Sequence, residues 1–250
     1  MKSMTVVKFG GSLTKNPAAQ SKFLKELAQI SRRQKIILVH GGGPEINALL
    51  DKFSIVSRFV NGLRFTDGAA LEVVEMALSG KVNRVLTTGL IKNKANAVGI
   101  SGKDGNSVVC KQVKSLGFVG EPVKVNKKLI EALTKAGFLP VIASVAADAK
   151  GNVMNVNADT LATAIAIAFK SDKLVFLTDV AGVLDKNKKT IKEIKINEIA
   201  PLIKNQTITG GMIPKIKGCA ESVKKGVKEV WIADGMKGIK NIRGTVIKKG

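Results

Sequence analysis

The chain opens with one pattern written twice, as VVKFGGS at residues 6–12 and again as IILVHGGGP at residues 36–44. In both segments a run of apolar, mostly β-branched residues leads into glycines, and a helix-like segment follows. Glycine lets backbone N–H groups approach an anion at the positively polarised start of a helix. Two such turns in one chain predict a site that binds and transfers a phosphoryl group.

Other glycine-rich motifs do not fit these turns. The P-loop signature G-x-x-x-x-G-K-[ST] occurs nowhere in the 250 residues. An esterase oxyanion loop at residues 40–43 is excluded, because G-x-S-x-G is absent and the single histidine, already inside the turn, leaves none as a general base. A dinucleotide-binding turn is disfavoured, because G-x-G-x-x-G is absent and no acidic residue follows about twenty positions on.

Strand-like and helix-like segments alternate along the chain. Apolar, β-branched runs predict strands at Thr5–Phe9, Lys35–His40, Ala97–Ile100, Leu139–Val145, Leu174–Thr178 and Glu229–Ala233. Helical spacing of apolar residues predicts helices at Pro17–Gln34, Asp67–Gly80, Lys127–Gly137 and Asn157–Lys170. This alternation predicts an α/β fold, a three-layer αβα sandwich with a mainly parallel central sheet. Ligands of such sheets bind beyond the carboxyl ends of the strands, where both glycine turns fall.

A lobe boundary is predicted near residue 170, where an alanine-rich helix ends and Ser171-Asp172-Lys173 leads into a new strand. The chain is then a single domain with an N-terminal lobe at residues 1–170 and a C-terminal lobe at residues 171–250. No linker, repeat or low-complexity tract separates the lobes, so we expect them to pack closely.

Composition predicts a globular, cytoplasmic protein. The apolar fraction is 45%, and no apolar run approaches the roughly 18 to 20 residues that a membrane span requires. Cys110 and Cys219 lack partner spacing and, with one histidine, cannot form a zinc cluster, so we expect core thiols. The net charge of +22 would suit an anionic partner, but the absence of Tyr and a single Trp disfavour nucleic-acid binding. A lysine-rich solvated surface is expected instead.

Single charged side chains mark the candidate site. Lys8 interrupts an apolar strand just before a glycine pair, and because a buried ammonium is costly, we expect it to contact an anion. Arg64 precedes a helix that Asp67 could cap, and its planar fork suits a carboxylate, although a surface ion pair is an alternative. Asp159 falls in a first helical turn, where it could compensate the helix dipole or hold cationic groups. Lys215 stands at a helix start, which favours a shared anion.

Taken in order, these segments resemble the amino acid kinase family over essentially the whole chain. The resemblance rests on VKFGGS (7–12), VHGGGP (39–44), NGLRFTD (61–67), NVNAD (155–159), LTDVAGVL (177–184) and TGGMIPK (209–215). Related kinases for aspartate, glutamate, carbamate, isopentenyl phosphate or UMP share the early glycine turns. The combination of HGGGP, NGLR and NVNAD resembles the branch that acts on N-acetyl-L-glutamate.

The resemblance implies the amino acid kinase fold and a reaction in arginine biosynthesis. The γ-phosphoryl group of MgATP would pass to the side-chain carboxylate of N-acetyl-L-glutamate, giving N-acetyl-L-glutamyl 5-phosphate. A carboxylate nucleophile is already ionised and needs no general base, so positioning and charge neutralisation remain. The N-terminal lobe would bind the acyl amino acid and the C-terminal lobe ATP. Mg²⁺ would be held by phosphates and water, with no protein metal site.

The resemblance also assigns roles to residues. Lys8 and Lys215 would stabilise the transferring phosphoryl group from opposite sides, with Asp159 holding both ammonium groups. Arg64 would bind the α-carboxylate of the substrate, and Asn155 would help to fix the acetylated amino acid. Backbone N–H groups would contact phosphoryl oxygens and the substrate at Gly10, Gly11, Gly41, Gly42 and Gly43. The ATP pocket would be lined by Asp179, Val180, Ala181, Gly182, Val183, Leu184, Thr207, Ile208 and Thr209.

Departures from the family pattern leave alternatives open. Phe65 stands where this branch often has valine, which could reshape the substrate pocket. The first strand begins close to Met1, so the resemblance implies a homodimer without the N-terminal helix, and without the arginine feedback, of hexameric members.

One alternative is a kinase for glutamate or aminoadipate attached to an acidic amino-group carrier protein. The net charge of +22 would suit such a partner, but Leu63-Arg64-Phe65-Thr66 is more typical of the free-substrate branch. A second alternative is a non-enzymatic nucleic-acid-binding protein on a degenerate kinase scaffold. That alternative predicts missing phosphoryl-site residues, which are present here.

Overall fold

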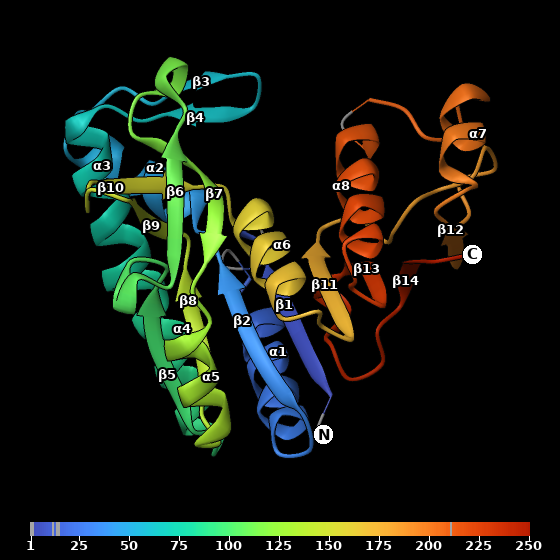
Figure 1. Ribbon diagram of the computed structural model, residues 1–250, viewed down its shortest axis with the longest axis horizontal. Helices are drawn as coiled ribbons and strands as arrows, with labels where there is room; N and C mark the ends of the chain where they lie inside the picture. The colour runs from blue at the N-terminus through green and yellow to red at the C-terminus, as the bar shows by residue number, and fades with distance from the viewer. Residues whose placement is uncertain (1–2, 12, 14–15, 211) are drawn as a thin grey trace.

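The computed structural model describes residues 3–11, 13, 16–210 and 212–250; Ser12 and Gly211, which belong to two of the motifs, lie outside the described residues. One eight-stranded sheet runs through the molecule in the order β12-β14-β13-β11-β1-β2-β8-β5 (Figure 1). Its pairings are parallel except for the antiparallel pair β13–β14. The strands are β1 (Met4–Phe9), β2 (Lys35–His40), β5 (Ala97–Ser101), β8 (Leu139–Ala143), β11 (Lys173–Thr178), β12 (Glu193–Lys195), β13 (Glu229–Asp234) and β14 (Gly244–Lys248).

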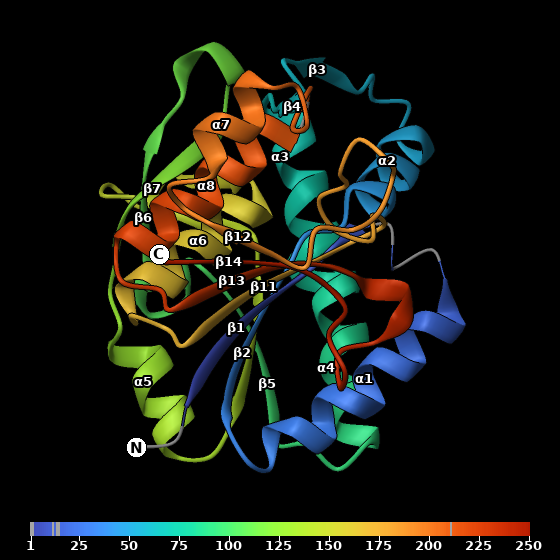
Figure 2. The ribbon, with the colours of Figure 1, turned by 90° about the vertical axis from the view of Figure 1, so that its right-hand side faces the viewer.

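Helices cover both faces of this sheet (Figure 2). One face carries α5 (Lys128–Lys135), α6 (Ala158–Ala168), α7 (Ile199–Lys204) and α8 (Met212–Lys224), and the other carries α1 (Pro17–Ser31) and α4 (Asn83–Lys92). Side chains alternate along a strand, so β1 feeds both layers. Val6 packs in one core cluster with Ile165 of α6, whereas Val7 packs in another with Phe23 and Leu27 of α1. The predicted αβα sandwich is confirmed.

β1 lies in the middle of the sheet and joins the two predicted lobes. It pairs with β2 on one side and with β11 on the other. α6 ends at Ala168 and β11 begins at Lys173, on either side of the predicted boundary. One continuous sheet therefore crosses the predicted boundary. Among the described residues, no helix is both long enough and apolar enough to span a membrane.

A second β layer, which the sequence did not predict, stands over the carboxyl ends of the N-terminal strands. It is a closed barrel of β6 (Val108–Gln112), β7 (Val119–Val125), β9 (Val145–Asp148) and β10 (Val153–Val156), beside a hairpin of β3 (Arg58–Val60) and β4 (Leu63–Phe65). The single strand predicted over Leu139–Val145 is wrong. The chain leaves the main sheet at Ser144, whose N–H donates to the carbonyl of His40, and Val145 begins a barrel strand.

The helix predicted over Asp67–Gly80 continues well beyond Gly80. It comprises α3 (Gly68–Glu75), a π-helical segment η2 (Met76–Val82) and α4. The side chain of Asp67 caps α3 by accepting from the N–H of Ala70 at 2.9 Å, which confirms the predicted cap. The remaining elements are α2 (Gly43–Lys52) and the short 3₁₀ turns η3 (Asp104–Asn106), η4 (Lys114–Leu116) and η5 (Gly235–Lys237).

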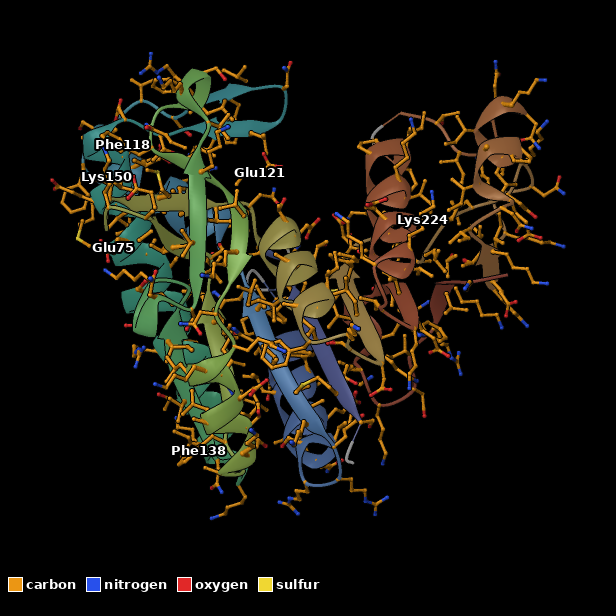
Figure 3. All side chains as sticks on the ribbon, viewed as in Figure 1. Glu75, Phe118, Glu121, Phe138, Lys150 and Lys224 are labelled. Carbon is orange, nitrogen blue, oxygen red and sulfur yellow. The ribbon has the colours of Figure 1, made fainter. Side chains whose placement is uncertain are left out.

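Basic side chains project from both halves of the molecule. Lys150, between β9 and β10, and Lys224, on α8, belong to different halves (Figure 3). Some lysines pair with acidic neighbours one turn away, such as Lys135 with Glu131 on α5. Both halves therefore carry part of the net charge of +22.

Candidate active site

The two glycine turns lie side by side because the strands before them are paired. Phe9 and His40 are register partners in β1 and β2, so the chain leaves both strands at neighbouring points. A Cβ built on Gly11 would lie 3.0 Å from Cδ of Pro44 and 3.4 Å from the backbone nitrogen of Gly43. This close approach favours glycine at position 11. The prediction that both turns meet at the carboxyl ends of the strands is confirmed.

Three charged side chains from three different elements meet beside the first turn. Nζ of Lys8, on β1, lies 2.9 Å from Oδ1 of Asp159, on α6. Nζ of Lys215, on α8, lies 3.7 Å from Oδ2 of the same carboxylate. The Lys8 ammonium is also 3.7 Å from a Cβ built on Gly10. Two ammonium groups against one carboxylate leave a net positive charge, which suits a phosphoryl group.

The position of Asp159 is set by the start of α6. Oδ1 of Asn157 accepts from the N–H of Asp159 at 2.9 Å and from that of Thr160 at 3.1 Å. Asn157 is thus the helix cap, and Asp159 falls in the first turn, as predicted. The side chain of Asp159 keeps 35% of its surface exposed, against 15% for Lys8 and 25% for Lys215. The three charges are therefore within reach of a ligand.

A separate pocket of about 190 Å³ opens next to these charges, between the second glycine turn, the β3–β4 hairpin and β10. All four residues predicted to bind the substrate line it: Gly42, Gly43, Arg64 and Asn155. Gly41 and Ala158 also line the pocket, and Ala158 directly precedes Asp159. The pocket therefore adjoins the charged group. Phe65 is not among its lining residues.

The guanidinium of Arg64 is held in a fixed orientation. It donates to Oδ1 of Asn47 at 2.5 Å and to Oγ of Ser57, and its carbon lies 4.7 Å from the ring centre of Phe59. Burial lowers the pKa of Arg64 from its usual value, but a guanidinium stays protonated in proteins. Sequence reasoning missed Asn47 and Ser57; their only signal was proximity to the second glycine turn and to NGLRFTD.

Asn155 faces the same pocket from β10. Its Nδ2 donates to Oγ1 of Thr66 at 3.1 Å, and its backbone N–H donates to the carbonyl of Phe118. These contacts leave the side-chain carbonyl of Asn155 as an acceptor for a ligand N–H. Thr66, inside the NGLRFTD motif, is a further residue that sequence reasoning missed.

The segments predicted to bind ATP lie at the same carboxyl edge of the sheet. Asp179 to Leu184 follow β11, and Thr207 to Thr209 precede α8. Val180 and Leu184 are exposed. The side chains of Val183 and Ile208 are each 1% exposed and pack in the core, which leaves their backbone groups as the atoms available to a nucleotide. The backbone of Val183 is held by a 2.8 Å hydrogen bond from its N–H to Oγ1 of Thr245.

The carboxylates near the site leave a metal ion to be held mainly by the bound substrate. In the part of the chain that the structure describes, no group of three or more His, Cys, Asp and Glu side chains could hold a metal ion. Both carboxylate oxygens of Asp159 face ammonium groups. Such surroundings suit Mg²⁺, because that ion keeps several waters and is commonly bound through substrate phosphates.

Both cysteines are buried and free. Burial raises the pKa of Cys110 and of Cys219 to about 12 in each case. Such thiols are protonated at neutral pH and are poor nucleophiles and ligands. The expectation of core thiols is confirmed.

Residues 3–234 of this sequence match the amino acid kinase family. The chain belongs to the amino acid kinase family. A curated family member from Endomicrobium trichonymphae, named acetylglutamate kinase, is 77% identical over 249 residues and aligns over the full length of both chains. Another acetylglutamate kinase, from Clostridioides difficile, is 44% identical over 236 residues, which cover 92% of this chain and 82% of that one.

A solved structure shares the amino acid kinase fold over its whole length. The crystal structure of smu.665 from Streptococcus mutans UA159 superposes with a TM-score of 0.86, covers 100% of both chains and is 31% identical in sequence. The family resemblance carried by the six motifs is thus confirmed by sequence and by fold.

Proposed function

We propose that this chain transfers the γ-phosphoryl group of ATP to the side-chain carboxylate of N-acetyl-L-glutamate, a step in arginine biosynthesis. One observation carries the proposal. A pocket lined by Arg64 and Asn155 adjoins the first turn of α6, where Asp159 lies between Lys8 and Lys215. The full-length relatives named acetylglutamate kinase support the same substrate.

The substrate is held at its amino acid end. A guanidinium has five N–H donors, so Arg64 can bind a carboxylate while it keeps its bonds to Asn47 and Ser57. The side-chain carbonyl of Asn155 accepts from the acetamido N–H. Gly42 and Gly43 line the same pocket and would offer their backbone N–H groups to the substrate. These contacts orient the distal carboxylate toward the charged group.

Phosphoryl transfer then needs no proton movement. A carboxylate oxygen forms a bond to the γ-phosphorus, the bond from that phosphorus to the β–γ bridging oxygen breaks, and ADP leaves with the electron pair. Lys8 and Lys215 neutralise charge on the oxygens of the group in transit, while Asp159 keeps their ammonium groups in place. The N–H groups of Gly10, Gly11 and residues 41–43 provide further donors. Mg²⁺, held through the phosphates and water, would add positive charge.

The lobes divide the ligands between them in this proposal. Residues 1–170 bind the acyl amino acid, and residues 171–250 bind ATP through 179–184 and 207–209, with the backbone contributing at Val183 and Ile208. A nucleotide and two buried, reduced thiols are consistent with a cytoplasmic enzyme.

A homodimer is the further part of the proposal. Val85 and Ile91 of α4 are about half exposed, next to the sheet edge formed by β5. A second copy would cover this apolar surface. Light scattering of the purified protein should give twice the chain mass of 26.5 kDa. A monomer at all concentrations would reject this part alone.

Trapping the acyl phosphate with hydroxylamine tests the activity. The protein with MgATP and free N-acetyl-L-glutamate should form the hydroxamate, and omission of either substrate should abolish it. The same assay with glutamate attached to a carrier protein separates the carrier alternative. Product from the carrier-bound substrate alone would reject the proposal. No product from either, with a folded protein, would reject both kinase functions.

A further inference from the structure

His40, the single histidine of the chain, is a residue that the proposed reaction leaves without a role. It ends β2 directly before the second glycine turn and is completely buried. Its Nδ1 lies 2.9 Å from the carbonyl oxygen of Gly41, and its Nε2 lies 3.1 Å from Nδ2 of Asn83. The imidazole thus joins the glycine turn to the start of α4.

The neighbours of Asn83 determine where the imidazole carries its proton. The same amide nitrogen lies 2.8 Å from the carbonyl oxygen of Val141 and 3.1 Å from that of Ile100. Carbonyl oxygens only accept, so the atom facing them must be the amide nitrogen and not its oxygen. Nε2 of His40 therefore faces a donor and is unprotonated. The proton resides on Nδ1, and this N–H donates to Gly41.

The imidazole keeps this neutral form at physiological pH. Burial lowers the pKa of His40 to about 4. The bond to Gly41 raises this pKa in part, and the nearby charge of Arg84 lowers it further. A charged imidazole would carry a second N–H on Nε2, opposite the amide nitrogen of Asn83, which cannot accept it. His40 is therefore not a proton carrier for the reaction, and its contribution must come through the bond that it makes.

That bond sets the direction of the next peptide group. In a trans peptide the C=O of one residue and the N–H of the next lie in one plane and point in opposite directions. His40 holds the carbonyl of Gly41 toward its buried ring, so the N–H of Gly42 points away from that ring, and Gly42 itself lines the substrate pocket. The bond from the N–H of Ser144 to the carbonyl of His40 holds the peptide on the other side.

We propose that His40 is a positioning residue, which aims the N–H of Gly42 at the bound ligands by holding the carbonyl of Gly41. The inference rests on the proposed function, because it assigns the Gly42 N–H a ligand. Without the imidazole the peptide could turn over, which would present a carbonyl oxygen to phosphoryl or carboxylate oxygens. Repulsion would then replace a hydrogen bond.

The first test uses the unaltered protein and no activity assay. With a single histidine, ¹⁵N labelling gives one pair of imidazole resonances. We expect a protonated Nδ1 and an unprotonated Nε2 from pH 6 to 8, with no titration in that range. An Nε2–H tautomer, or a histidine that titrates near its ordinary pKa of 6.5, would overturn the inference and leave the proposed function untouched.

The second test separates positioning from simple core stability. In His40→Asn the amide nitrogen takes the place of Nδ1, and in His40→Gln it takes the place of Nε2. Both variants lose part of the buried imidazole, but His40→Asn alone keeps a donor for Gly41. We expect kcat to fall about 100-fold in His40→Gln, the size of effect that a misplaced catalytic group produces, and clearly less in His40→Asn.

Melting temperatures of both variants show whether a fall in kcat is only unfolding. Thr87→Val is the matched control, because it removes a buried hydroxyl of α4 for which no bond to the glycine turn is found among the described residues. It should change the melting temperature without lowering kcat. Equal losses in both His40 variants, or a greater loss in His40→Asn, would overturn the inference. If neither variant folds, the tautomer measured in the unaltered protein decides.

Discussion

The guanidinium of Arg58 lies 4.4 Å from the ring centre of Phe65, its register partner across the β3–β4 hairpin. The next register pair, Phe59 and Arg64, reverses the arrangement. Because successive side chains of a strand point to opposite faces, the two pairs lie on opposite sides of the hairpin. Phe59 and Arg64 line the pocket, whereas Arg58 and Phe65, on the other side of the hairpin, do not.

Phe65→Val should therefore leave the KM for N-acetyl-L-glutamate within about twofold, because neither Phe65 nor its partner Arg58 lines the substrate pocket. Phe59→Ala, which removes the ring under Arg64, should raise that KM about two- to fivefold, because an exposed cation–π pair is worth ~0.5–1 kcal/mol. Steady-state kinetics with ATP saturating measures both. A larger effect in Phe65→Val than in Phe59→Ala would show that Phe65 shapes the substrate pocket after all.

Lys8→Ala should lower kcat about 10²- to 10³-fold, the usual cost of losing one preorganised charge, with little change in melting temperature. Asp159→Asn should also lower kcat, because the two ammonium groups lose the carboxylate between them. The double variant should lose less than the sum of the two single losses, since the residues touch. Lys224→Ala, an exposed lysine elsewhere on α8, is the control and should keep normal kcat. Strict additivity would contradict a shared role.

Gly42→Ala should destabilise the protein, whereas Gly43→Ala should not. A Cβ built on Gly42 would lie 2.8 Å from Cδ2 of Leu78 and 3.0 Å from Cγ2 of Val82, both on η2, but nothing lies within 4 Å of one built on Gly43. Overpacking of this kind costs about 1–3 kcal/mol of unfolding free energy. Chemical denaturation of the two variants measures the difference. Equal stability would mean that η2 yields to the added methyl group.

Asp172 should stabilise the fold only above acid pH. Two hydrogen bonds lower the pKa of Asp172 below its ordinary 3.8. The larger effect comes from the bond that Lys228 donates, and the smaller from the N–H of Met4, which lies 2.8 Å from Oδ2. A depressed pKa means that the folded state binds this proton less readily than the unfolded state, so the stabilisation is complete above pH 3.8 and is lost as pH falls through the folded value.

Asp172→Asn should consequently have a lower melting temperature than the unaltered protein at pH 7, and the gap should close below about pH 3.8. Thermal melts of both proteins across this range provide the measurement. A gap that stays constant into the acid range would show that the charge of Asp172 contributes nothing.

The parts of the fold that could be predicted are those in which apolar residues form a clear run or recur at a regular spacing. β1 and β2 each contain a run of buried apolar residues and are followed by glycines, and β11 and β13 contain similar apolar runs, so their positions matched. The hairpin strand β3 has three exposed residues and hence no buried face to leave a pattern. In β7, Gly120 and Pro122 interrupt the alternation of apolar and polar residues, and only Val119 and Gly120 are buried.

The site divides in a similar way. Residue type and position pointed to Lys8 and Lys215, whereas their meeting at Asp159 came from family resemblance, since no local pattern encodes contacts among β1, α6 and α8. Asn83 lay outside every motif. Its importance arises from a fold contact, at the point where the π-helical segment passes into α4 beneath His40.

The central place of β1 has a consequence for how the protein is made. Met4, at the start of β1, bonds to Asp172, 168 residues later in the chain, where β11 begins. At a synthesis rate of ~5–20 residues per second, roughly 10 to 30 s pass on the ribosome between the two strands. During that time β1 can pair with β2, but its other edge has no native partner. The nascent chain therefore carries an open, apolar strand edge until its last third emerges.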